Sequence, residues 1–236
     1  MIDIRIPILV YHQVDLPPTR KTPFRGLTVA PQNFRRQMRA LKRCGFQGLS
    51  LRELLPYLQG EMSGKVVGIT FDDGYRNVFT HALPILDEAG FTATNFFVSG
   101  QIGGHNEWDE AAGIPYAPCM TQAQVREWAA RGHEVGAHTL DHVRLTQVSL
   151  EQARAQILRS RVELEDLVGE AVTSFSYPWG DVSDAVRGMV QEAGYLAATT
   201  TRPAKASSQD DPLLLPRKYI EQQHGWVATI LKCVSG

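Results

Sequence analysis

Short apolar runs alternate with amphipathic stretches along the chain, and this alternation limits the folds open to it. The runs predict strands at residues 8–11, 66–71, 93–98, 133–138, 172–177, 195–200 and 213–219. Helical spacing predicts helices at 33–44, 78–89 and 183–193, and capping boxes at Thr121/Gln124 and Ser149/Gln152 open two more. Strand–helix units in this order are typical of a parallel sheet. We therefore expect one α/β domain over residues 1–236, most economically a barrel.

Composition excludes several classes of protein. Of 236 residues, 43% are apolar, so the chain can bury a core, and 24 basic against 25 acidic residues give a net charge of −1. That balance gives no electrostatic reason to expect nucleic acid or an anionic membrane as the main partner, although it does not exclude local basic patches. Three cysteines without a Cys-x-x-Cys pair exclude a disulfide framework and a cysteine zinc finger.

Targeting signals are not evident. We expect no membrane span, because nowhere do about 18 apolar residues run together. The start of the chain, Met1-Ile-Asp-Ile-Arg-Ile-Pro, lacks the apolar core and cleavage site of a signal peptide. The sequence as written therefore predicts a cytoplasmic protein, or an extracytoplasmic one if a leader was removed.

Two adjacent carboxylates follow the most apolar predicted strand. Asp72 and Asp73 come directly after residues 66–71 and precede Gly74. In a parallel barrel, active sites lie at the carboxyl ends of the strands. The two charges repel unless a cation or a proton offsets them. The alternative is an Asp-Gly turn with solvated side chains.

Two histidines leave a later strand. His138 and His142 end and follow residues 133–138. An isolated pair at this spacing often arises by chance, but the Asp pair at an earlier strand end favours a metal site. One aspartate and two histidines leave an open coordination position, as in catalytic zinc sites.

A tight loop follows the strand at 172–177. Pro178 and Gly180 constrain it, so it can aim backbone N–H groups into a cleft that Tyr177 and Trp179 line. An ordinary strand-to-helix turn with two packing aromatics is the alternative.

Taken together, residues 70–74, 138–142 and 177–180 resemble the first three motifs of the polysaccharide deacetylases, carbohydrate esterases with a NodB homology domain. The resemblance runs from about residue 8 to residue 220. It implies a distorted (β/α) barrel of about seven parallel strands. The implied activity is metal-dependent removal of N-acetyl groups from acetylated amino sugars, with release of acetate.

By position in these motifs, the resemblance assigns roles to individual residues. Asp73, His138 and His142 would hold one divalent metal ion, zinc first, with cobalt, nickel or iron as alternatives. Asp72 would be the general base, and the backbone N–H of Trp179 would help to stabilise the oxyanion.

The chain also departs from the familiar motifs. Ser176 stands where an arginine usually braces the catalytic aspartate, and no convincing fourth motif or late Leu-x-His motif is present. The opening Pro7-Ile-Leu-Val-Tyr-His12 resembles the branch of poly-N-acetylglucosamine deacetylases with permuted motif order. That resemblance makes His12 the general acid, with His224 as the alternative, and Arg217 a replacement for the missing brace.

The implied substrate is an acetylated amino-sugar polymer, oligomer or precursor. Aromatic side chains near the strand ends are expected to contact it, namely Tyr11, Tyr75, Tyr177 and Trp179, with Trp108 and Tyr116 in the long loop at 99–120. Two other functions fit the same residues: hydrolysis of a small non-sugar amide, and sugar binding without catalysis. The sequence leaves a homo-oligomer open.

Overall fold

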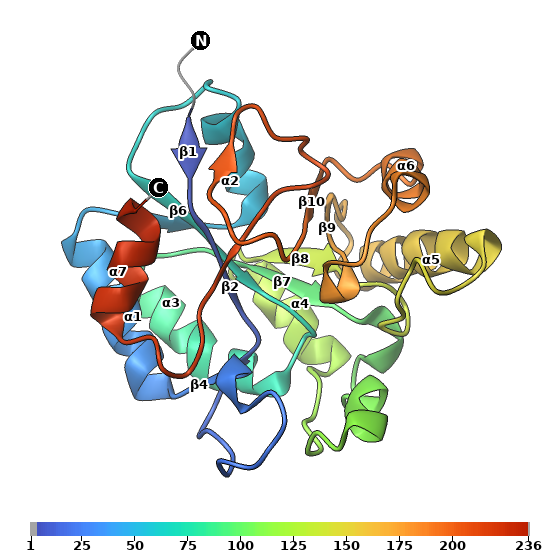
Figure 1. Ribbon diagram of the computed structural model, residues 1–236, viewed down its shortest axis with the longest axis horizontal. Helices are drawn as coiled ribbons and strands as arrows, with labels where there is room; N and C mark the ends of the chain where they lie inside the picture. Colours follow the sequence, from blue (N-terminus) through green and yellow to red (C-terminus); the bar gives the residue numbers. More distant parts are fainter. Residues whose placement is uncertain (1–3, 236) are drawn as a thin grey trace.

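Seven parallel strands form a curled sheet at the centre of the computed structural model, which describes residues 4–235 (Figure 1). Their order across the sheet is β10 (Ala197–Thr199), β9 (Ser174–Ser176), β8 (Glu134–Ala137), β7 (Thr94–Phe97), β6 (Val66–Phe71), β2 (Ile8–Tyr11) and β12 (Lys218–Tyr219). A further parallel strand, β5 (Gln47–Leu49), pairs with the first half of β6. The sheet forms a half-barrel, which confirms the predicted distorted (β/α) barrel.

Two apolar layers hold this sheet, one on each face. β6, Val-Val-Gly-Ile-Thr-Phe, is buried along its whole length, as expected of a parallel strand covered on both faces. Because side chains alternate along a strand, Ile8 and Phe96 join the inner core cluster, whereas Leu9 and Phe71 join the outer one.

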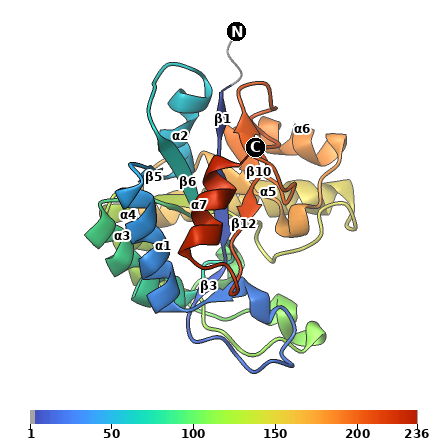
Figure 2. The same ribbon diagram turned by 60° about the vertical axis from the view of Figure 1, so that its left-hand side comes forward.

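Helices cover the outer face. They are α1 (Pro31–Arg43), α3 (Leu83–Ala89), α4 (Gln122–Ala130), α5 (Leu150–Val168), α6 (Asp184–Glu192) and α7 (Trp226–Val234). α1 packs between α7 and α3, and α5 packs between α4 and α6 (Figures 1 and 2). The capping boxes at Thr121 and Ser149 are present as predicted. The helix predicted at 78–89 begins with a π-helical turn, Val78–Ala82, before α3.

One helix, α2 (Leu51–Leu58), contributes to the inner core instead and was not predicted, because Pro56 interrupts its pattern. Two buried side chains accept hydrogen bonds from the first turn of α2. The Arg52 N–H donates to Glu134 Oε2 (2.8 Å), and the Leu51 N–H donates to Thr94 Oγ1 (2.7 Å). These bonds satisfy N–H groups that a helix start otherwise leaves unpaired.

Residues 215–219 link the two ends of the sheet. Leu215 forms a parallel bridge with Thr199 of β10, and β12 then pairs with β2. The predicted strand at 213–219 is therefore too long: only Lys218–Tyr219 is a strand, because Pro216 has no N–H to donate to a ladder.

The remaining elements are short. β1 (Arg5–Ile6) pairs with β11 (Ala206–Ser207), and β3 (Gln13–Val14) pairs with β4 (Thr28–Val29). Short 3₁₀ helices lie at Arg25–Leu27, Ser99–Gln101, Glu107–Ala112 and Pro178–Gly180. Within residues 4–235, no helix has the length and apolarity needed to cross a bilayer.

Candidate active site

Backbone strain gathers at the carboxyl ends of the strands. Asp73, Thr139, His142 and Trp179 have φ angles of +75°, +66°, +56° and +55°, and among the described non-glycine residues only Phe24 shares this left-handed conformation. Each such residue costs on the order of 1–3 kcal/mol and persists only where the surrounding structure enforces it. The strain at Asp73, followed by Gly74, turns its carboxylate away from the strand direction, so that Asp72 and Asp73 reach the same rim.

Three side chains converge there as metal ligands would. The Nε2 atoms of His138 and His142 each lie 3.4 Å from Asp73 Oδ1, and one ligand atom from each residue lies within 4.8 Å of the other two. Ligand atoms about 2.1 Å from a zinc ion in tetrahedral geometry lie about 3.4 Å apart. The three residues therefore fit a divalent metal ion.

Protonation states also suit metal binding. His138 Nδ1 donates to the Ser176 carbonyl oxygen (2.7 Å), which fixes the ring so that Nε2 faces Asp73. Burial lowers the pKa of His142 against the opposing pull of Asp73. Burial alone would raise the pKa of Asp73, but hydrogen bonds from both histidines hold it well below its usual value. A carboxylate and neutral imidazoles are the ligating forms.

Asp72 lies apart from this cluster and is held by Arg217. The guanidinium donates to both carboxylate oxygens of Asp72 at 2.7 Å and also to Thr70 Oγ1 (3.2 Å) and Ser176 Oγ (3.0 Å). Arg217 is fully buried and lies over the Phe96 ring. Burial would raise the pKa of Asp72, but the charge and hydrogen bonds of Arg217 outweigh it and lower the pKa. Arg217, the predicted brace, is thus in contact with Asp72. Ser176, which stands at the usual arginine position, accepts a hydrogen bond from Arg217.

The structure separates the two candidates for the general acid. His12 lines the same cleft as Asp72, Asp73 and His138, and its ring stacks on Tyr219 with centroids 6.0 Å apart. His224 does not line the cleft: its Nδ1 accepts from the Glu221 N–H (2.8 Å). Geometry therefore favours His12.

The cleft that His12, Asp72, Asp73, His138 and His142 line has a volume of about 570 Å³. Trp179 is 41% exposed at its rim, 4.2 Å from the His142 ring by centroids, and the Arg144 guanidinium lies 4.4 Å over its indole. Tyr75 and Trp108 also line the cleft. Tyr177 lines it too, but its side chain is buried and its hydroxyl donates to the Leu213 carbonyl (3.1 Å).

The prediction that Tyr11 contacts substrate is wrong. Tyr11 is fully buried in the outer core, where it packs on Phe34 and donates to Gln37 Oε1 (3.1 Å). The reason is strand alternation: Tyr11 and His12 are neighbours on an extended chain, so when His12 faces the cleft Tyr11 faces the outer helices.

Sequence reasoning missed part of the cleft wall. Residues 13–28 supply much of it, including Leu16, Pro18 and Phe24. Asp109 also lines the cleft, and its Oδ2 accepts from the Tyr75 hydroxyl (3.2 Å). Burial, first, and the nearby Asp73 charge raise the pKa of Asp109. A usable signal was present, because a Pro-rich connection of this length inside a compact domain is typically functional.

A sequence model of the family described as polysaccharide deacetylase matches residues 59–198. The chain belongs to the polysaccharide deacetylase family. The matched segment contains Asp72, Asp73, His138, His142 and Trp179, whereas His12 and Arg217 lie outside it.

Relatives and solved structures agree with this family. YxkH of Bacillus subtilis strain 168, named as a candidate polysaccharide deacetylase, is 28% identical over 90% of this chain and 70% of its own length. A Bacillus cereus peptidoglycan-N-acetylglucosamine deacetylase is 30% identical over 56% of the chain, which spans about half of that protein (54%). The Staphylococcus aureus poly-beta-1,6-N-acetyl-D-glucosamine N-deacetylase is 22% identical over 82% of the chain and 68% of its own length.

Among solved structures, the Streptococcus pyogenes deacetylase PplD in complex with acetate superposes with a TM-score of 0.85 at 25% identity, covering 98% of this chain and 99% of PplD. IcaB from Ammonifex degensii has the same fold, with a TM-score of 0.82 at 24% identity and 98% and 97% coverage.

Proposed function

We propose that this protein hydrolyses N-acetyl groups on an acetylated amino-sugar polymer or oligomer and releases acetate. One observation carries the proposal: a buried carboxylate, Asp72, is held by a buried arginine beside a three-residue metal-ligand cluster in one cleft. Family membership supports the same reaction class.

The three ligands would hold a divalent ion, for which zinc is our first choice because His and carboxylate ligands with an open position suit it. Such an ion polarises a carbonyl and lowers the pKa of water from about 15.7 towards about 7. Asp73, His138 and His142 are each less than 9% exposed, so the cleft already shields this position from bulk solvent.

Asp72 would act as the general base. Its lowered pKa keeps it ionised at neutral pH, and the two Arg217 bonds fix the carboxylate plane. Oδ2 also accepts from Ser176 Oγ (3.4 Å), whereas Oδ1 keeps a second lone pair for a proton. In the proposed step, Asp72 takes a proton from water as the water oxygen bonds to the acetyl carbon. His12 then gives a proton to the sugar nitrogen as the C–N bond breaks. The Trp179 N–H would stabilise the oxyanion.

N-Acetylglucosamine units are the substrate we infer. The relatives named above for a substrate act on peptidoglycan N-acetylglucosamine or poly-β-1,6-N-acetylglucosamine, which share that unit. Exposed Trp179 on the cleft rim offers an aromatic face on which a sugar ring can stack.

Two substitutions test the proposal, with metal content and acetate release measured on the same samples. Asp72→Asn should retain the metal and lose turnover, because Asp72 is not a ligand. His138→Ala should lose both. The matched control is His105→Ala, since His105 lies in the long loop against Tyr116 and outside the cluster. Wild-type turnover in Asp72→Asn, or full metal content in His138→Ala, would contradict the assignment.

A further inference from the structure

Helix α7 carries an apolar stripe that the described chain does not cover. Trp226, Val227, Leu231 and Val234 are 50–55% exposed. At 100° per residue they fall within one 140° sector of the helix. Thr229 and Cys233, which are buried, fall outside this sector, and the helix packs on α1. Single exposed apolar residues are ordinary, but four on one nine-residue helix form a contiguous patch.

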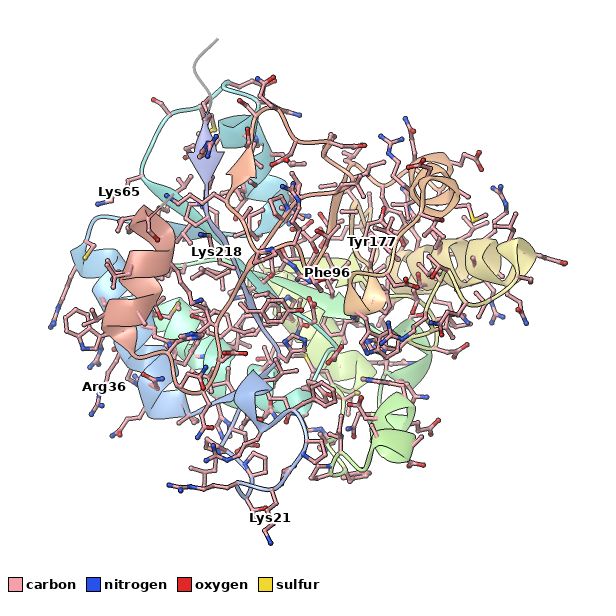
Figure 3. All side chains as sticks on the ribbon, viewed as in Figure 1. Lys21, Arg36, Lys65, Phe96, Tyr177 and Lys218 are labelled. Carbon is pink, nitrogen blue, oxygen red and sulfur yellow. The ribbon has the colours of Figure 1, made fainter. Side chains whose placement is uncertain are left out.

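Basic residues are concentrated on α7 and on the neighbouring helix α1. α1 and α7 together contain six basic and no acidic residues, namely Arg35, Arg36, Arg39, Lys42, Arg43 and Lys232. Arg35 and Arg39 pair with Glu88, whereas Arg36 and Arg43 are exposed. Figure 3 labels Arg36, Lys65 and Lys218 around α7. The net charge of −1 therefore hides a strongly basic face.

A pocket of about 460 Å³ lies at the carboxyl end of the stripe. Arg5, Lys65 and Lys205 line it beside Val234, and no acidic residue does. Lys65 Nζ donates to the Cys44 carbonyl and Lys205 Nζ to the Val234 carbonyl, which leaves each ammonium with further N–H donors. Burial, first, and then the nearby charges of Lys218 and Arg5 lower the pKa of Lys205.

We propose that α7 and this pocket dock the protein on the surface of an anionic lipid bilayer. The stripe would enter the boundary between headgroups and acyl chains, Arg36 and Arg43 would face the negative surface, and a headgroup phosphate would bind between Lys65 and Lys205. A second copy of this chain is a poorer occupant, because it would bring the same positive charges to the contact. This surface is separate from the catalytic cleft, so the proposal stands apart from the proposed function.

Cosedimentation with lipid vesicles tests it on the whole chain. Wild-type protein should bind vesicles of phosphatidylcholine mixed with phosphatidylglycerol, and not vesicles of phosphatidylcholine alone. Binding should weaken as salt screens the charges. The double variant Val227→Asp/Leu231→Asp should abolish binding. The matched control, Leu158→Asp/Val162→Asp, changes residues of similar exposure on α5, on the opposite side of the molecule (Figure 1). It should bind like the wild type.

Charge is tested separately. Lys65→Gln and Arg36→Gln should each lower the partition coefficient about fivefold, whereas Arg159→Gln on α5 should not. Acetate release from a soluble substrate should be unchanged in all of these variants, which shows that they fold. Equal binding to neutral vesicles, or undiminished binding by the α7 variant, would overturn the proposal. The proposal would also be overturned if the wild-type protein bound no vesicles and instead formed a dimer in sedimentation velocity that Leu231→Asp dissociates.

Discussion

Replacing Arg217 with methionine isolates the interaction on which the site depends. The guanidinium is fully buried and makes two 2.7 Å bonds to Asp72, which is itself 3% exposed. At an effective dielectric of about 20, charges about 4 Å apart attract by about 4 kcal/mol. Breaking a buried pair from one side typically costs about 3–5 kcal/mol, because the remaining charge stays buried without a partner. We therefore expect Arg217→Met to lower the free energy of unfolding by about 3–5 kcal/mol.

Calorimetry and urea titration can measure this loss. For a chain of this size, about 3–5 kcal/mol corresponds to a fall in Tm of about 6–20 °C. The matched control is Arg187→Met. Arg187 also binds both oxygens of an aspartate, Asp211, at 2.8 and 3.1 Å, but the two side chains are 27% and 31% exposed. A solvated pair of this kind contributes about 0–1 kcal/mol.

A double variant completes the cycle. In Asp72→Asn/Arg217→Met neither charge is left buried alone, so much of the lost stability should return. Turnover should not return, because Asp72 is the proposed base. Equal losses in Arg217→Met and Arg187→Met would refute the reasoning, as would single-variant losses that simply add in the double variant.

The remaining predictions concern the general acid, a buried acid and the metal. His12→Gln should lower the rate of acetate release by about 10²–10⁴-fold, whereas His224→Gln should not change it; the reverse result would make His224 the acid. Burial raises the pKa of Glu134 from its usual 4.5, despite hydrogen bonds that oppose the shift. The protonated side chain therefore contributes its full stability below the pKa of the unfolded chain, and this contribution is lost as pH rises through the raised pKa of the folded protein. Urea titrations should therefore show Glu134→Gln gaining stability relative to the wild type as pH rises from about 4 to 7, and a difference that is constant with pH would contradict this. A metal present at about a hundred times its Kd adds about 2.7 kcal/mol, so a chelator should lower the wild-type Tm by about 5–11 °C. The Tm of His138→Ala should not respond to the chelator, and an equal response would exclude His138 as a ligand.

Local patterns in the sequence predicted most of the regular structure. The strand at 66–71 and the capping boxes at Thr121 and Ser149 match the structure. Each depends on residues within a few positions of one another, so the sequence contains the whole signal. The box at Ser50 and Glu53 was equally visible, but Pro56 hid the helix it opens.

The motifs also predicted that Asp73, His138 and His142 lie close together, because parallel strands place their carboxyl ends on one rim, and the structure has them as one cluster. By contrast, the strain at Asp73, His142 and Trp179 was not predictable. Left-handed backbone in such residues is imposed by surrounding packing and not by local preference.

The sequence by itself determined the alternation of strands and helices and the identity of the polar residues that end the strands. Only the tertiary structure decided that Arg217 reaches Asp72 across 145 positions of the chain, that His12 faces the cleft while Tyr11 faces the core, and that α7 leaves its apolar stripe exposed. Those outcomes depend on how the sheet curls and on residues 215–219, which link its two ends. Contacts between residues so far apart in the chain leave no periodic pattern in a single sequence.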